Sequence, residues 1–227
     1  MITWDVPGYV VAFTTRAGGV SEAPYDSLNL TTGTGDDPER VEGNRRIACE
    51  SLGLAYDRLA FNRQIHSPTV HRAVAGRRGT PGDGLWSDEP GVPLLAMSAD
   101  CLQIAVATTD GSRRLAVLHA GWRGLAEGVV AAGVAALGDG PKAAVVGPAI
   151  GPCCYEVGDE VSSLFEADLT TERKLDLWMA AERALRRAGV DRVDRVDVCT
   201  RDHPDLYFSH RRDGLARGVQ GVIGAVA

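Results

Sequence analysis

Short apolar runs that end at turn-forming residues constrain the fold of this chain most. Four of them stand in its central part, at residues 94–97, 102–107, 115–118 and 143–146. Runs of this length, bounded by Gly, Pro, Asp or Ser, indicate buried strands. Because several connections between them are too short for a crossover helix, a purely parallel sheet is disfavoured.

Helical patterns alternate with these runs. Residues 125–137 are rich in Ala and Val, and residues 174–188 carry large apolar side chains at steps of three and four, with Gly189 just beyond. A glycine after the last turn is typical of a helix C-terminus. A further helix is expected to begin near Pro38, and residues 193–199 alternate Val with charged residues, as a half-buried strand does. The sequence therefore predicts an α/β or α+β protein, a layered sandwich with a mixed sheet.

Bulk properties favour one globular domain over residues 1–227. No linker or repeat interrupts the chain, and its 44% apolar content suffices for a substantial core. A net charge of −6 with mixed signs argues against a nucleic-acid partner. No run reaches the roughly 18 apolar residues that span a bilayer, and the first residues do not resemble a signal peptide. Five cysteines, an odd number, fit free thiols in the cytoplasm, and adjacent Cys153 and Cys154 are expected to be small buried hydrophobes.

Three residues far apart in the chain are candidates for a reactive centre: His66, Cys101 and His119. Each stands beside small or turn-forming neighbours at the end of an apolar run. Two imidazoles and a thiolate suit zinc, and three protein ligands leave a fourth position for water or substrate. Cys101 and His119 could instead be a metal-free nucleophile and its base. The residues alone leave both chemistries open.

Two arginines are candidates for anion binding. A strand over residues 115–118 delivers His119 to a turn, and a helix is expected to start near Arg123. The Arg123 guanidinium would then create an anion-binding pocket beside the histidine. Arg16 opens a glycine-rich turn and could also hold a phosphate, although a surface arginine is the commoner outcome at such a turn.

Three further polar residues are candidates for the site. Asp100 precedes Cys101 and could orient a ligand or move a proton, or it could cap a turn. His210 and Arg211 belong to the polar stretch Ser-His-Arg-Arg-Asp-Gly, which could be a wall of a substrate pocket or a plain surface turn. The chain has no P-loop, no Gly-x-Gly-x-x-Gly and no Gly-x-Ser-x-Gly, so nucleotide-triphosphate cofactors, dinucleotide cofactors and a serine nucleophile elbow lose support.

Nine motifs run in order over nearly the whole chain. They include Gln-Ile-His at residues 64–66, Ala-Asp-Cys at 99–101 and His-Ala-Gly-Trp-Arg-Gly at 119–124; the others stand at 15–21, 24–30, 35–38, 147–151, 154–157 and 208–213. In this order they resemble the YfiH-like family, also called laccase-domain or polyphenol-oxidase-like proteins. The chain departs from the family pattern in three places. Ser67 stands where the family usually has Gly after the His. Gly82-Asp83-Gly84 replaces a more usual Ala-Asp-Ala-like triplet, and the segment around Arg217 does not reproduce the usual Gly-Arg-Gln.

The resemblance implies a fold, an activity and a ligand set. The fold is a single α/β sandwich. The activity is that of a zinc-dependent purine nucleoside phosphorylase, which acts on adenosine, inosine, guanosine and methylthioadenosine with phosphate and also deaminates adenosine. Carried over residue by residue, the zinc ligands are His66, Cys101 and His119.

The laccase name suggests copper, but the residues do not. A multicopper oxidase needs a histidine-rich cluster, whereas this chain has five histidines and no His-Cys-His triplet. Copper is therefore expected only as an adventitious ion in vitro. Two other functions stay open: a Cys101/His119 hydrolase that acts on a peptide, an amide or a cell-wall precursor, and a non-catalytic protein that binds a purine as a signal.

Overall fold

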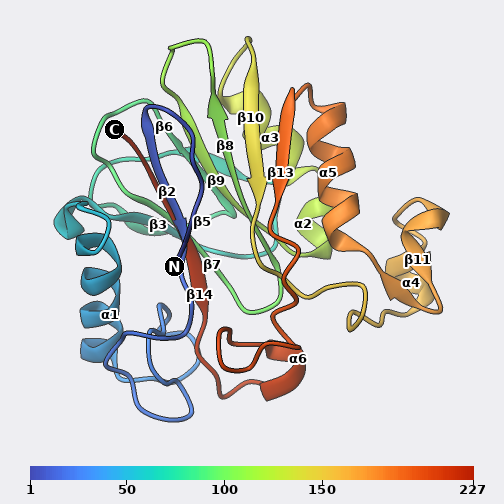
Figure 1. Cartoon of the computed structure of the whole chain (residues 1–227), viewed down its shortest axis with the longest axis horizontal. Helices are drawn as coiled ribbons and strands as arrows, with labels where there is room; N and C mark the ends of the chain where they lie inside the picture. The colour runs from blue at the N-terminus through green and yellow to red at the C-terminus, as the bar shows by residue number, and fades with distance from the viewer.

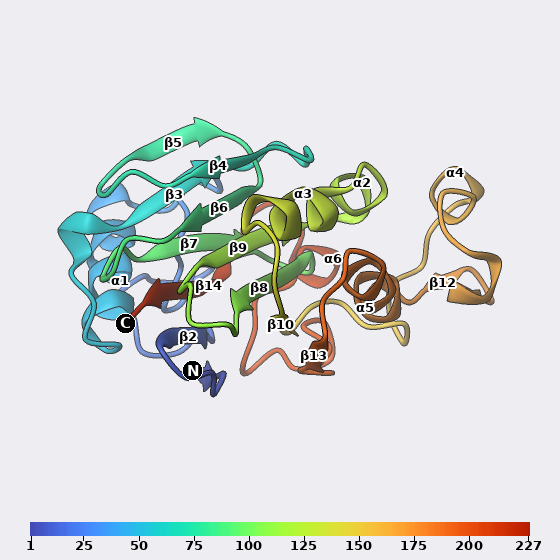
Figure 2. The same cartoon turned by 90° about the horizontal axis from the view of Figure 1, so that it is seen from above.

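Two six-stranded sheets pack face to face, and helices cover both outer sides (Figure 1, Figure 2). The computed structural model describes all 227 residues. The first sheet has the order β1 (Ile2–Thr3), β2 (Tyr9–Phe13), β14 (Gln220–Val226), β7 (Leu94–Ser98), β3 (Ala60–Arg63) and β5 (Arg78–Pro81). The second has the order β13 (Arg192–Arg195), β10 (Lys142–Val146), β8 (Leu102–Thr108), β9 (Leu115–Ala120), β6 (Gly84–Ser87) and β4 (Val70–Arg72).

The helices form the outer layers. Helix α1 (Pro38–Glu50) packs on the first sheet, whereas α2 (Trp122–Ala126), α3 (Val129–Ala136) and α5 (Leu177–Arg187) pack on the second. The shorter elements are α4 (Asp159–Ser162), α6 (His210–Asp213), the hairpin of β11 (Thr170–Thr171) and β12 (Lys174–Leu175), and the 3-10 turns η1 (Tyr56–Arg58) and η2 (Ala167–Leu169). None of the helices combines the length and the apolar character that crossing a membrane requires.

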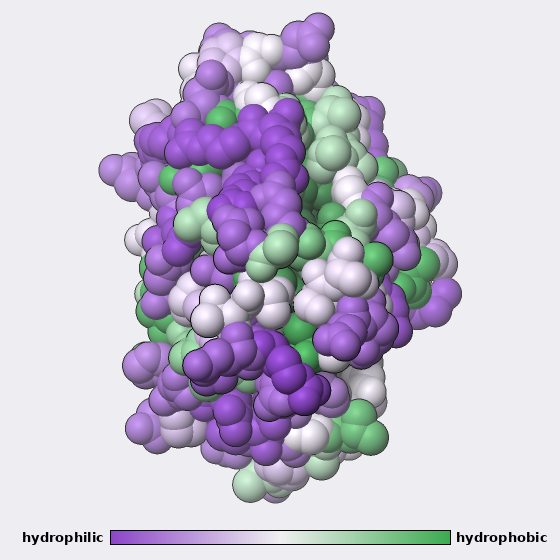
Figure 3. Space-filling view, turned by 90° about the vertical axis from the view of Figure 1, so that its right-hand side faces the viewer, coloured by the Kyte–Doolittle hydropathy of each residue, from purple (hydrophilic) through white to green (hydrophobic).

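Helix α4 and the β11–β12 hairpin protrude from one end of the molecule (Figure 1). Figure 3 looks onto this end and shows mostly hydrophilic side chains, with apolar ones exposed in a band between them. The hairpin therefore extends the surface beyond the layered body.

Side chains of the central strands alternate between two cores. Leu102, Ile104 and Val106 of β8 pack toward the helices on the second sheet. Ala105 and Ala107 of the same strand pack toward the first sheet. A strand that is buried on both faces needs apolar residues at successive positions, which explains why Gln103 is the only polar residue among residues 102–107 of β8.

Both sheets are mixed. Strand β3 pairs in parallel with β5 and β7, while β14 pairs antiparallel with β2 and β7. In the second sheet β10 pairs in parallel with β13 and antiparallel with β8. The predicted layered sandwich with a mixed sheet is confirmed.

Several predicted boundaries are also confirmed. Helix α1 begins at Pro38, and the Asp37 side chain caps it by accepting a hydrogen bond from the Glu39 N–H at 2.8 Å. Helix α5 is followed by Gly189 with φ 87°, in the left-handed region that favours glycine after a helix.

Three predicted elements differ from the structure. The helix predicted over residues 125–137 is two helices, because Gly128, with φ 93°, separates α2 from α3. The helix predicted over 174–188 begins only at Leu177, because the two residues of β12 pair in the hairpin. The strand predicted over 193–199 ends at Arg195, because its partner β10 ends just before Gly-Pro, and proline has no N–H to donate.

Candidate functional site

Three connections carry the chain from the first sheet to the second at one end of the sandwich. They join β3 to β4, β5 to β6 and β7 to β8. Because β3 is parallel to β5 and β7, the three strands end at the same edge of the first sheet. His66 lies on the first connection, Asp83 on the second and Cys101 on the third. His119 reaches the same place from the end of β9, which runs antiparallel to β8.

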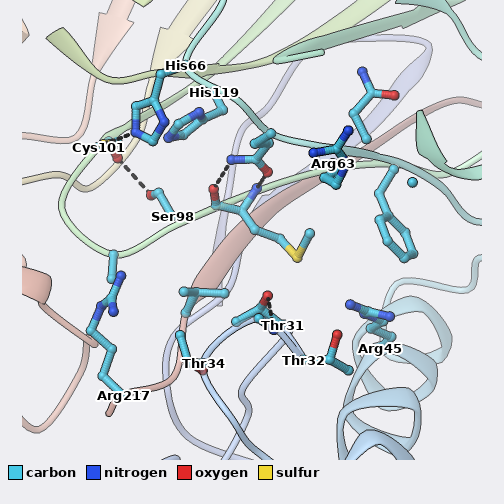
Figure 4. Close-up of a pocket in the computed structure, with 18 residues that line it drawn as sticks. Thr31, Thr32, Thr34, Arg45, Arg63, His66, Ser98, Cys101, His119 and Arg217 are labelled. Carbon is cyan, nitrogen blue, oxygen red and sulfur yellow. Dashed lines mark hydrogen bonds between the residues drawn. The ribbon is translucent and has the colours of Figure 1, made fainter. Parts of the chain in front are cut away.

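The topology therefore gathers His66, Cys101 and His119. Their ligand atoms all lie within 4.8 Å of one another. The two imidazole rings meet edge to face, with centroids 4.9 Å apart and planes at 82°, and the Cys101 Sγ lies 3.9 Å from the His66 Nε2. Figure 4 shows the three side chains together at one end of a cavity. This donor set is compatible with a metal ion.

The buried Asp83 carboxylate fixes this arrangement. Its Oδ1 lies 2.8 Å from His119 Nδ1 and accepts the His66 N–H at 2.9 Å. Its Oδ2 accepts the N–H groups of Ile65 at 3.1 Å and Ser67 at 2.7 Å. Although burial opposes ionisation, these hydrogen bonds hold the pKa of Asp83 well below its usual range. With Nδ1 of His119 held by the carboxylate, its Nε2 is the nitrogen available to a metal or a substrate.

Cys101 and His119 alter each other's protonation. Burial alone would raise the pKa of the thiol, but the neighbouring imidazoles, His119 foremost, lower the pKa of Cys101 to about 6. Burial alone would lower the pKa of His119, but the Cys101 thiolate and Asp83 raise it to about 9. A thiolate beside an imidazolium is therefore favoured in the protein without metal. Because a thiolate can act as a metal ligand or as a nucleophile, a deprotonated Cys101 is consistent with a metal site and with a hydrolase.

The backbone conformation around the cluster allows its three side chains to approach one another closely. His66 has φ 59° and Asp100 has φ 88°, both in the left-handed region that costs energy for residues other than glycine. A Cβ at Gly121 would lie 2.7 Å from the His66 Cδ2 and 3.1 Å from the Cys101 Sγ. A glycine directly after the His-Ala pair is therefore needed for the three ligands to converge.

Two cavities open onto the cluster. The larger one, of about 630 Å³, is the cavity of Figure 4, and it is lined by all three cluster residues and by Thr31, Thr34, Arg45, Arg63, Ser98 and Arg217. The smaller one, of about 230 Å³, shares His66 and Cys101 and is further lined by Asp100, Trp122, Arg123, Tyr155, His210 and Arg211. The cluster thus stands between two compartments that a molecule could enter.

Asp100 positions one wall of the smaller cavity. Its carboxylate accepts hydrogen bonds from the Thr200 hydroxyl at 2.6 Å, the Ser209 hydroxyl at 3.1 Å and the Arg211 N–H at 2.7 Å. These bonds tie the segment that carries His210 and Arg211 to the connection that carries the Cys101 thiol. The carboxylate is thus engaged with protein donors on both of its oxygens.

The two candidate arginines lie in different places. Arg123, at the start of α2, lines the smaller cavity, and its guanidinium lies 4.4 Å from the centre of the Trp122 ring. Arg16 lines neither cavity of the cluster: it pairs with the Asp26 carboxylate at 3.2 Å and donates to the Pro204 carbonyl at 2.9 Å. The structure brings Arg123 to the cluster and does not bring Arg16 there.

Sequence reasoning missed two residues of the site. Asp83 stands between two glycines in the triplet that departs from the family pattern, and only the sheet crossing shows that it faces His119. Arg217 lies in the unusual C-terminal segment; it lines the larger cavity, its Nε is buried without a hydrogen-bond partner, and burial lowers its pKa. In the sequence, the only indication of a role for Asp83 or Arg217 was a charged residue in a segment that departs from the family pattern.

Known proteins match the chain along almost its entire length. The family model described as multi-copper polyphenol oxidoreductase laccase matches residues 10–226. A Pseudomonas aeruginosa protein named "Purine nucleoside phosphorylase PA4543" is 40% identical over 224 residues, which cover 92% of this chain and 90% of the relative. The Escherichia coli protein named "Purine nucleoside phosphorylase YfiH" is 35% identical over 227 residues, which cover 92% and 91%.

Solved structures share the fold. The Neisseria meningitidis protein NMB0706 superposes with a TM-score of 0.89 at 35% identity, and the match covers 99% of this chain and 98% of that one. YlmD from Geobacillus stearothermophilus superposes with a TM-score of 0.89 at 32% identity, covering 97% and 92%. The chain therefore belongs to the laccase-like family of that model, the YfiH-like family that its sequence motifs indicate.

Proposed function

We propose that this protein is a zinc-dependent purine nucleoside phosphorylase whose centre is formed by His66, Cys101 and His119. The observation that carries the proposal is the convergence of these three donors, within 4.8 Å, at the junction of two cavities. The names of the relatives support the reaction class. The proposed nucleosides are adenosine, inosine, guanosine and methylthioadenosine, and adenosine deamination is proposed as a second activity.

The second imidazole favours a metal over a thiol nucleophile. A cysteine nucleophile needs one base and one group that orients the base, and Cys101, His119 and Asp83 would suffice for that. His66 would then have no role, yet it is held in a left-handed conformation with its Nε2 3.9 Å from the Cys101 Sγ. A metal explains why a third donor points at the same spot.

The two cavities suit the two substrates of phosphorolysis. In this reaction phosphate attacks C1′ of the ribose while the purine leaves, so anionic and cationic charge develop close together. Arg123 and Arg211 in the smaller cavity would hold phosphate, and burial raises the pKa of Tyr155 there to about 12, so its hydroxyl stays a neutral donor. The nucleoside would occupy the larger cavity, whose volume of about 630 Å³ is within the usual range for small-molecule sites. Bound zinc would supply positive charge beside the reacting atoms and lower the pKa of water for deamination.

Replacement of Arg123 by alanine should weaken the use of phosphate. A lost charged hydrogen bond costs about 1.5–3 kcal/mol, so kcat/KM for phosphate should fall roughly 10- to 150-fold, and Arg123→Lys should not restore it fully because the planar fork is lost. Steady-state kinetics with varied phosphate and saturating inosine measure this. Arg16→Ala is the matched comparison, since Arg16 is tied to Asp26 outside both cavities. A larger loss in Arg16→Ala than in Arg123→Ala would contradict this placement of phosphate.

Chelation should switch off the enzyme and expose its thiol. A metal ligand is masked from alkylation, so iodoacetamide should label Cys101 at least about tenfold faster after metal removal. Phosphorolysis of inosine should stop with chelation and return on addition of zinc. Peptide mass spectrometry of the labelled thiol and release of free purine base are the two readouts.

The opposite pattern would support the alternative hydrolase. The lowered pKa of Cys101 beside His119, which Asp83 orients, is the observation that favours a thiol nucleophile. If chelated protein keeps full activity and alkylation of Cys101 abolishes it, the hydrolase that acts on a peptide, amide or cell-wall precursor replaces the zinc enzyme as the better hypothesis.

A further inference from the structure

A second group of thiols lines neither of the two cavities. The ligand atoms of Cys153, Cys154, Cys199 and Asp202 all lie within 4.8 Å of one another. The sequence favours buried small hydrophobes at the adjacent pair, but the structure places Cys153 on the surface and Cys154 half-buried. Cys199 is buried in the core and Cys154 packs against it, but core packing does not account for Cys153.

The group joins two turns that are distant in sequence. The Asp202 carboxylate accepts a hydrogen bond from the Cys153 thiol at 3.1 Å and from the Cys154 thiol at 3.0 Å. The Cys199 Sγ accepts the N–H of Gly151 at 3.3 Å. Four candidate donors thus face one point from the turn before Tyr155 and from the turn after β13.

These donors match the preferences of zinc. Three sulfurs and one carboxylate oxygen complete a tetrahedral set without water, which is typical of a structural site. Sulfurs around tetrahedral zinc lie about 3.8 Å apart, since a Zn–S bond is about 2.3 Å. The thiols are thus within a small side-chain movement of that geometry. Cys153 and Asp202 are exposed, which provides an entry path.

A disulfide explains the group less well. Three thiols cannot all pair, and adjacent cysteines are poorly placed to bond with each other. A disulfide from Cys199 to Cys153 or to Cys154 would leave the other thiol unpaired. It would also remove one of the two thiol donors that bind the Asp202 carboxylate, without replacing it. A cation satisfies all four groups at once.

We propose that Cys153, Cys154, Cys199 and Asp202 form a second, structural site for a thiophilic divalent ion such as zinc. Binding would release the thiol protons to solvent and would clamp the two turns together. The turns flank the smaller cavity, because Cys154 precedes Tyr155, which lines it, and Cys199 precedes Thr200, which donates to Asp100. The inference does not depend on the proposed catalytic function.

Metal counting in separate variants tests the proposal. Wild-type protein, purified with its thiols reduced, should hold about two zinc ions per chain by elemental mass spectrometry. Cys101→Ala and Cys199→Ser should each hold about one, and the double variant should hold none. Because Cys199 is buried, its substitution could disturb folding, so two exposed positions are tested as well. In the Cys101→Ala background, Cys153→Ser and Asp202→Asn should leave folding unchanged and must each weaken zinc binding at least about tenfold. Asp205→Asn, an exposed carboxylate in the same segment, is the control and should bind as before.

A spectroscopic probe identifies the ligands directly. Cobalt(II) added to metal-free Cys101→Ala should give the intense near-ultraviolet absorption of tetrahedral thiolate–cobalt, and Cys199→Ser in that background should abolish it. Zinc should raise the unfolding midpoint of Cys101→Ala by at least about 4 °C. The proposal is overturned if reduced Cys101→Ala binds no metal, if the freshly isolated thiols are found as a disulfide, or if bound zinc leaves the unfolding midpoint unchanged.

Discussion

Cys101→Ala is expected to lower kcat/KM for phosphorolysis by at least about 10³-fold and to remove the metal from the cluster. The reason is that only two imidazoles, one of them exposed, would then be left to hold an ion. Elemental analysis measures the metal content per chain, in which an ion held by Cys153, Cys154, Cys199 and Asp202 is also counted. The loss of activity is measured as turnover of inosine with phosphate.

Another thiol provides the control for this change. Cys49 is buried between α1 and the first sheet and lines neither cavity, and burial raises its pKa to about 12. Cys49→Ala should keep both the metal and the activity. Equal metal at the cluster in the wild type and in Cys101→Ala would remove Cys101 from the ligand set.

Asp83→Ala should lower the free energy of unfolding by about 3–5 kcal/mol. The change leaves the N–H groups of residues 65–67 and the His119 ring without their acceptor in a buried place. Because folding lowers the pKa of Asp83, its contribution is complete above about pH 3.9, the ordinary value for Asp, and is lost as the pH falls below it. Denaturant unfolding at pH 7 and at pH 3 checks both statements.

Two further variants serve as the control and the conservative replacement for Asp83→Ala. Asp88→Ala removes a half-exposed carboxylate that pairs with Arg72 on the surface, and it should change stability little. Asp83→Asn keeps the shape but exchanges one acceptor for a donor, so it should fall between wild type and Asp83→Ala. A loss in Asp83→Ala no greater than in Asp88→Ala would show that the carboxylate does not organise the site.

The sequence predicted the strands because burial on both faces leaves a local trace, an unbroken apolar run such as that of residues 115–118. It also predicted the candidate cluster, because His66, Cys101 and His119 stand where such runs end. It did not predict the order of strands in either sheet, because pairing is decided by contacts between segments far apart. For the same reason it gave Asp83 no role, offered Arg16 as a phosphate ligand and treated Cys153 and Cys154 as buried small hydrophobes.

Because the chain passes from one sheet to the other at the cluster, the three cluster residues connect the two layers. His66 follows a strand of the first sheet, whereas His119 is the second-last residue of β9 in the second sheet. An ion bound to both would therefore oppose sliding or separation of the two layers. Binding and packing are then thermodynamically linked, and each must strengthen the other. Substitutions between the sheets, at positions such as Leu94 or Val117, could therefore adjust the affinity for metal without touching a ligand. The hydrophobic core would act as a part of the coordination site.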